Sequence, residues 1–161
     1  VKPAKEIESA KKGLVVRPII FKETNSRCQV DLIDMQNEPD SDYKFILLYQ
    51  DHVTKFIQLR PLVNKRAEEF THNLLDIFTI LGALSILQSG NGYEFCQSQR
   101  SVERADQDVE NMLMIWIDTN QTLHWSEDLR FVQFVKNRAH HEDINCSPSL
   151  GFQKKLAFGN L

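Results

Sequence analysis

The side chains of this 161-residue chain that could do chemistry are chiefly carboxylates that lie far apart in the sequence. Asp31 lies within an apolar stretch, and Glu103 lies where a helical pattern begins. Carboxylate oxygens are the ligands that Mg²⁺ prefers, and Mg²⁺ often needs only one or two of them besides the phosphates of a substrate. Well-separated carboxylates of this kind could therefore serve Mg²⁺-dependent chemistry on a phosphate group.

Each of these acids also has a simpler reading. Asp31 can be a strand-end residue satisfied by backbone N–H groups, and Glu103 can be a first-turn glutamate favoured by the helix dipole. Asp34 is three positions beyond Asp31, so it falls on the opposite strand face and is expected to be exposed. Asp106 and Glu110 share the side of the helix that carries Glu103, and they are expected to form a solvated face.

The histidines and cysteines offer little further chemistry. The run at 140–143, His-His-Glu-Asp, could suggest zinc, but adjacent residues on a helix point apart. The three cysteines, Cys28, Cys96 and Cys146, have no C-x-x-C spacing, which disfavours a disulfide framework or a zinc knuckle. Cys96 is expected in a loop and to be inert, and reduced thiols are typical of an intracellular protein.

The elements that must position these residues follow from hydrophobic periodicity. Apolar runs predict strands at 28–35, 43–49 and 55–62, and a short fourth strand at 85–88. Helical spacing predicts helices at 65–81, 101–119 and 125–140. A helix between the third and fourth strands allows a parallel return into the sheet. We therefore predict an α/β fold, in which a three-stranded meander and one parallel strand form a mixed sheet with flanking helices.

Charge and composition divide the chain unevenly. Residues 1–27 carry seven Lys/Arg and three Glu, a charge of +4, so the remainder of this chain of net charge −3 carries −7. We predict a basic linker or arm at 1–27, a core domain at 28–145 and an irregular tail at 146–161. The arm is the expected contact if the protein meets DNA, although a solvated linker explains it equally well. No apolar run suits a membrane helix, and a start without Met is typical of a fragment of a longer protein.

Four blocks in this order resemble the catalytic core of retroviral and gypsy-type retrotransposon integrases, which belongs to the ribonuclease-H-like superfamily. They are the first strand at 28–35, the hairpin at 49–56, the block at 82–95, which ends Gly-Asn-Gly-Tyr-Glu-Phe, and the segment at 97–104. Together with the segment at 125–134, they are most similar to domesticated integrase-derived host proteins that pair such a core with KRAB or SCAN boxes. The resemblance covers residues 13–150.

The resemblance implies a catalytic site that has lost a ligand. Integrase cores hold two Mg²⁺ ions with two Asp and one Glu, and the matching positions here are Asp31, Gly90 and Glu103. Gly90 has no side chain, and losing one such electrostatic element typically costs ~10²–10³ in rate. The interval from Gly90 to Glu103 is also 103 − 90 = 13 residues, which is too short for the family. A segment after Phe95, comprising the fifth strand and one helix, is therefore expected to be deleted, which leaves the fourth strand as a sheet edge.

Two functions follow as hypotheses. The first is a degenerate, catalytically inactive integrase core that acts in DNA association or protein interaction, as a homodimer or with another protein, in the nucleus. The second is a residual Mg²⁺-dependent nuclease or strand transferase that uses Asp31 and Glu103, with Asp51 or Glu94 in place of the missing ligand. Neither hypothesis involves a membrane or a small-molecule substrate.

Overall fold

The structure, a computed structural model, describes residues 27–82, 85–89, 96–122 and 124–158. Its centre is a four-stranded sheet in the order β3-β2-β1-β4. The strands are β1 (Arg27–Asp34), β2 (Phe45–Asp51), β3 (Ile57–Leu62) and β4 (Ile86–Ser89). β2 pairs antiparallel with both β1 and β3, and β4 pairs parallel with β1. The predicted meander and its parallel return are therefore confirmed.

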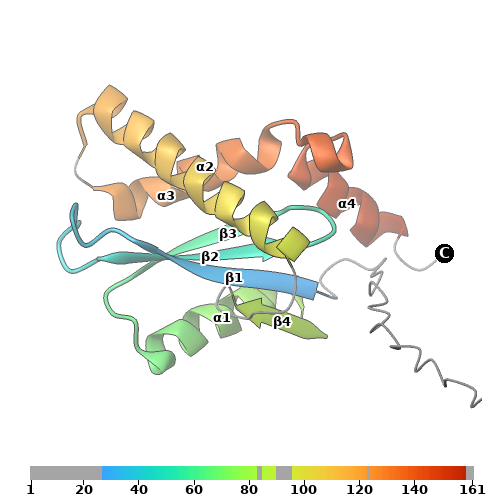
Figure 1. The fold of residues 1–161 in the computed structure, drawn as a ribbon, viewed down its shortest axis with the longest axis horizontal. Helices are drawn as coiled ribbons and strands as arrows, with labels where there is room; N and C mark the ends of the chain where they lie inside the picture. The colour runs from blue at the N-terminus through green and yellow to red at the C-terminus, as the bar shows by residue number, and fades with distance from the viewer. Residues whose placement is uncertain (1–26, 83–84, 90–95, 123, 159–161) are drawn as a thin grey trace, which may run out of the picture.

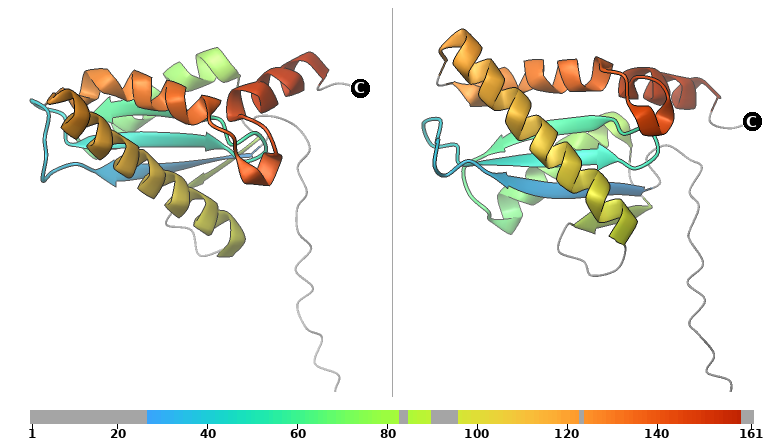
Figure 2. Two further views of the ribbon diagram at one scale, coloured as in Figure 1. Left: turned by 90° about the horizontal axis from the view of Figure 1, so that it is seen from above. Right: turned by 45° about the horizontal axis from the view of Figure 1, so that its top comes forward.

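Helices cover both faces of the sheet. They are α1 (Ala67–Leu81), α2 (Cys96–Asn120), α3 (Trp125–Arg138) and α4 (Pro148–Phe158), with a short 3₁₀ helix, η1 (Glu142–Ile144), before α4. α1 connects β3 to β4 and lies on one side of the sheet, whereas α2 and α3 lie on the other (Figure 1). Figure 2 shows α2 running obliquely across the strands. The three predicted helices are confirmed.

The sheet separates two apolar cores because alternate residues of a strand point to opposite faces. Beneath α2 and α3, the strands bury Ile33, Ile46, Leu48, Ile57 and Leu59 against Ala105, Val109, Leu113, Trp125, Leu129 and Val132. Beneath α1, they bury Cys28, Val30, Phe45, Leu47, Tyr49 and Leu62 against Leu74 and Ile77. β2 is buried along its whole length, as its continuous apolar sequence predicts.

The N-terminal part of α2 corrects one prediction. The helix begins at Cys96 rather than at residue 101, so the expected loop position of Cys96 is wrong. The residues from Cys96 to Arg100 are mostly polar and carry no apolar stripe. Hydrophobic periodicity therefore gave no sign of this first turn and a half, which extends a helix anchored further along by Ala105 and Val109.

The predicted irregular tail at 146–161 is also wrong for Pro148–Phe158, which forms α4. Proline suits the first position of a helix because its fixed φ angle and missing N–H cost nothing there. The Ser147 hydroxyl accepts a hydrogen bond from the Leu150 N–H at 3.3 Å. Phe152 stacks on Phe56, with ring centroids 4.7 Å apart. Tertiary contact thus supports a helix whose glycine and proline had indicated a loop.

Candidate functional site

Asp31 lies in the middle of β1, on the sheet face that α2 and α3 cover. Its partner in β2 is Leu48, which belongs to the core beneath those helices. Asp31 is half-buried, and its Oδ1 accepts a hydrogen bond from the Leu32 N–H at 2.9 Å. This backbone N–H contact agrees with the simpler reading of Asp31, but its expected place at a strand end is wrong, because Asp31 is internal to β1. Asp34 is exposed as predicted, and Lys65 Nζ lies 3.1 Å from its Oδ2.

α2 brings further carboxylates to the same face. The helix packs on β1 through its buried Ala105 and Val109, and Glu103 belongs to the turn just before them. The side chain of Glu103 lies outside the described part, so its predicted pairing with Asp31 stays a prediction. Asp106, one turn further on, is half-buried and its Oδ1 is shielded from solvent. The prediction of a solvated face is therefore wrong for Asp106, because the helix rotates it towards the sheet.

Two further predicted positions are that of the lost ligand, Gly90, and that of one proposed replacement, Glu94. Gly90 and Glu94 lie outside the described residues. In the part of the chain that is described, no three His, Cys, Asp or Glu side chains converge as a metal site would require. Of the predicted pair Asp31 and Glu103, only Asp31 has described side-chain surroundings.

Asp51, the other proposed replacement ligand, is remote from Asp31. It ends β2 opposite Cys28, whereas Asp31 pairs with Leu48, three residues earlier in β2. Since an odd offset reverses the side-chain direction, Asp51 points to the α1 side of the sheet and Asp31 to the α2 side. Asp51 is also buried, and its Oδ2 accepts hydrogen bonds from the Thr54 N–H at 2.7 Å and hydroxyl at 2.6 Å. It therefore holds the β2–β3 turn.

Cys28 lies beside Asp51 and is fully buried. Its Sγ is 2.8 Å from the Tyr49 hydroxyl, which donates to it, and 3.7 Å from Asp51 Oδ1. Burial raises the pKa of the Cys28 thiol to about 12, because the apolar surroundings disfavour the thiolate. Burial likewise raises the pKa of Tyr49 above its ordinary value. This cluster is a satisfied structural group and offers no nucleophile.

Cys28 should therefore resist alkylation in the folded protein. At pH 8, iodoacetamide is expected to label the half-buried Cys146 in the native state and Cys28 only after denaturation, since the thiolate is the reactive form. Mass mapping of the alkylated peptides with and without guanidinium measures this. Native labelling of Cys28 as fast as that of Cys146 would contradict the buried position of Cys28.

The His-His-Glu-Asp run at 140–143 makes structural contacts. The His141 Nδ1 accepts a hydrogen bond from the Asp143 N–H at 3.3 Å and caps η1. Asp143 pairs with Lys55 Nζ at 3.8 Å. Desolvation lowers the pKa of both His141 and Lys55, more than the nearby Asp143 raises either. The disfavoured zinc reading thus receives no support from the described geometry.

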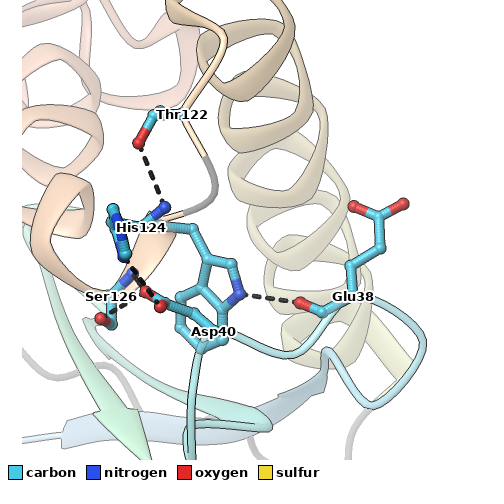
Figure 3. A network of polar contacts seen from close by, with 6 residues as sticks. Glu38, Asp40, Thr122, His124 and Ser126 are labelled. Carbon is cyan, nitrogen blue, oxygen red and sulfur yellow. Dashed lines mark hydrogen bonds and ion pairs between the residues drawn. The ribbon is translucent and has the colours of Figure 1, made fainter.

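A second polar network, which the sequence did not indicate, joins the β1–β2 loop to the start of α3 (Figure 3). Asp40 is buried, and its Oδ2 accepts hydrogen bonds from the Ser126 N–H at 2.8 Å and from the Ser126 hydroxyl at 2.6 Å. Its Oδ1 lies 3.3 Å from His124 Nδ1. The Trp125 indole N–H donates to the Glu38 carbonyl at 2.8 Å.

These three residue types also make up hydrolase triads, but their arrangement here is different. Ser126 and His124 both contact Asp40, and the Ser126 hydroxyl donates to a carboxylate instead of to an imidazole. A nucleophilic serine needs the base at its own hydroxyl. The network is instead a helix cap in which Asp40 accepts the Ser126 N–H, which the first turn of α3 leaves without a partner within the helix. Its only signal in the sequence is an Asp in a turn-rich loop.

Two hollows of the described surface are not lined by Asp31. One of about 530 Å³ lies between β3 and α3, and another of about 360 Å³ lies between α3 and the start of α4. Their linings include Arg60 and Gln133 in the first and Phe134 and Arg138 in the second. Across the described ranges, every helix is too short or too polar to span a bilayer.

Comparison with known proteins supports the integrase resemblance. No protein-family model matches the chain. KRAB-A domain-containing protein 2 of Homo sapiens is 43% identical over 174 residues, which include 92% of this chain and 35% of that protein. The chain thus spans 35% of the length of this curated relative. The HTLV-2 integrase catalytic core domain, solved with magnesium in a trimeric form, superposes with a TM-score of 0.65. The superposition covers 80% of this chain and 97% of that one at 16% identity.

The length of the alignment with the human relative can be compared with the deletion predicted after Phe95. The aligned stretch of 174 positions is longer than this whole chain of 161 residues, although only 92% of the chain takes part. The human relative therefore carries residues within the stretch that this chain lacks. Together, these comparisons show that the chain has the ribonuclease-H-like fold of integrase catalytic cores and resembles a segment of a KRAB-A domain-containing protein.

Proposed function

We propose that this chain is a catalytically inactive integrase core of a domesticated, retrotransposon-derived nuclear protein, and that it acts through DNA association or protein interaction. The observation that carries the proposal is the placement of Asp51. Two residues, Asp51 and Glu94, were proposed to replace the ligand lost at Gly90, and only Asp51 is among the described residues. Its carboxylate lies on the opposite face of the sheet from that of Asp31. Asp31 and Glu103 are then a vestige of the ancestral ligand set.

The arrangement of the carboxylates determines whether this domain could bind Mg²⁺. Mg²⁺ in such a site needs converging oxygen ligands, and two ions clamp the attacking and leaving oxygens of a phosphoryl transfer. Of the predicted pair Asp31 and Glu103, only the Asp31 side chain is described, and its Oδ1 already accepts the Leu32 N–H. Among the described residues, no three His, Cys, Asp or Glu side chains converge to hold a two-metal centre.

Charge and exposed apolar surface support the two non-catalytic roles. DNA association is assigned to the arm at 1–27, with a charge of +4, because the remainder carries −7 and would repel phosphates. Protein interaction, including homodimerisation, is supported by large apolar side chains that stand exposed on α2 and α3, such as Ile115 at 67% and Phe134 at 58%. Exposed apolar patches of this kind are typical of interaction sites.

The proposal is tested by a strand-transfer and nicking assay with labelled duplex DNA and Mg²⁺ or Mn²⁺. The wild-type chain is expected to give no more product than the Asp31→Asn variant. Gly90→Asp is expected not to restore turnover, because the segment between this position and Glu103 remains short. A catalytically active integrase core assayed in parallel confirms that the substrate and ions are competent.

One observation favours the alternative, a residual nuclease. α2 carries Glu103 and the partly shielded Asp106 across the face on which Asp31 lies. If this set still works, wild-type turnover should be abolished by Asp31→Asn and by Glu103→Gln, and should depend on the divalent ion. That outcome would overturn the inactive assignment, and Asp106→Asn would then show whether this residue replaces the missing ligand.

A further inference from the structure

The hollow of about 530 Å³ between β3 and α3 has a lining of mixed character. Three apolar residues contribute to it, Leu59, Pro61 and Leu129, and so do two arginines, Arg60 and Arg130. Leu59 and Leu129 are buried, whereas Arg60 is half-buried and Arg130 is exposed. The hollow therefore joins an apolar wall to two basic side chains that solvent can reach.

The β3 edge beside this hollow is closed to backbone pairing. Asn137 Oδ1 accepts the Ile57 N–H and Asn137 Nδ2 donates to the Ile57 carbonyl, both at 2.9 Å. Gln133 Oε1 accepts the Leu59 N–H at 2.7 Å. Pro61, the next residue whose backbone faces this way, has no N–H. α3 side chains and a proline therefore close this edge against a further strand, and a ligand in the hollow has to be recognised by side chains.

Both arginines of the hollow keep hydrogen-bond donors for a ligand. Within the described ranges, neither Arg60 nor Arg130 forms an ion pair with a carboxylate. Arg60 Nη1 donates to the Leu59 carbonyl at 2.8 Å, and the guanidinium carbon of Arg130 lies 5.5 Å from the centre of the Phe131 ring. Because a guanidinium has five N–H donors, these contacts leave most of the donors available.

The charges around the hollow leave room for one more acidic group. Glu127 contributes to the lining and Asp76 acts on Arg60 from α1, yet neither carboxylate is paired with an arginine in the part of the chain that is described. Burial lowers the pKa of Arg60, and the nearby Asp76 raises that pKa by less. The guanidinium has thus lost part of its hydration without gaining a paired carboxylate, and an incoming anion would offset that loss.

We propose that this hollow binds an acidic side chain carried on an apolar segment of a partner protein, with Arg60 and Arg130 holding the carboxylate. Arginine matches a carboxylate with two parallel hydrogen bonds, and arginine clusters recognise acidic motifs. A DNA backbone fits less well, because the lining includes Glu127 and the chain outside residues 1–27 carries −7, which repels a polyanion. The inference rests on the protein-interaction part of the proposed function and not on the loss of catalysis.

Side-chain NMR of the full 161-residue chain tests the proposal, with the peptide acetyl-Leu-Asp-Leu-amide as the probe. This peptide is expected to shift the Nε–Hε signals of Arg60 and Arg130 in a saturable way. Acetyl-Leu-Asn-Leu-amide, which has the same shape without the charge, should bind roughly tenfold or more weakly, because hydrogen bonds to a charged group are stronger. Arg130→Gln should weaken binding of the acidic peptide to the same degree, whereas Arg104→Gln, at an exposed position of α2, should leave it unchanged.

Three results would overturn the proposal, provided that unchanged β2 amide signals show each variant to be folded. The first is equal binding of the two peptides, or no saturable shift at either arginine. The second is a stronger shift of the same signals by a short DNA duplex, which would assign the hollow to a phosphate backbone. The third is a dimer in sedimentation that Arg130→Gln abolishes, which would assign the hollow to a second copy. None of these results depends on turnover in the strand-transfer assay, so this site and the inactive assignment are tested separately.

Discussion

Replacing Asn137 by alanine is expected to lower the free energy of unfolding by about 2–4 kcal/mol. The side chain is 4% exposed, and its amide satisfies both the N–H and the carbonyl of Ile57, which is fully buried. Each buried polar group left without a partner costs about 1–3 kcal/mol, and the better helix propensity of alanine offsets only a few tenths. Urea titration followed by circular dichroism measures the difference.

Asn111→Ala is the matched control, since it makes the same chemical change at an exposed position of α2. It is expected to shift stability by no more than about 0.5 kcal/mol. Asn137→Ala should also promote association at the freed β3 edge, which light scattering would detect. A loss below about 1 kcal/mol for Asn137→Ala would mean that water replaces the amide easily, and that α3 does not close this edge.

Asp40→Ala is the second substitution with a large expected effect, a loss of about 2–4 kcal/mol at pH 7. It leaves the Ser126 N–H and hydroxyl without their acceptor, and charge-assisted bonds of this kind contribute more than neutral ones. The exposed Asp42, in the same loop, supplies the control: Asp42→Ala should change stability by no more than about 0.5 kcal/mol.

Acid should weaken the same contact. Burial opposes ionisation of Asp40, but hydrogen bonds from Ser126 and the contact with His124 outweigh it and hold the pKa of Asp40 below its ordinary value. A folded-state pKa below the unfolded value of about 3.9 stabilises the fold above that pH, and the stabilisation is lost as the pH falls through the folded pKa. Asp40→Asn should therefore be less stable than wild type at pH 7, with a difference that narrows below about pH 4. A constant difference would contradict the role of the charge.

Much of the fold follows from the sequence alone because the decisive patterns are local. The apolar run of β2 predicts a strand buried on both faces, and the helical spacing from Phe70 to Leu81 predicts α1. Asp34 three positions after Asp31 predicts opposite faces of one strand. Four ordered blocks indicated the integrase core, and the superposition on the HTLV-2 core confirms its fold.

Other features depended on residues that are distant in the sequence and adjacent only after folding. Asp40 meets Ser126 across 86 positions, and Asn137 meets Ile57 across 80. α4 forms where glycine and proline favoured a loop, because packing on Phe56 outweighs weak local propensity.

For the candidate site too, some features follow from the sequence and others only from the folded structure. The sequence predicts which acid is missing, because the integrase resemblance aligns Gly90 with a catalytic Asp, and glycine has no carboxylate to offer a metal ion. Only the tertiary structure decided on which face of the sheet the proposed replacement, Asp51, lies. The register of β1 against β2 sets Asp51 opposite Cys28 and Asp31 opposite Leu48. An offset of three residues along a pleated strand then turns the two carboxylates to opposite faces of the sheet, and pairing register is a property of the folded chain.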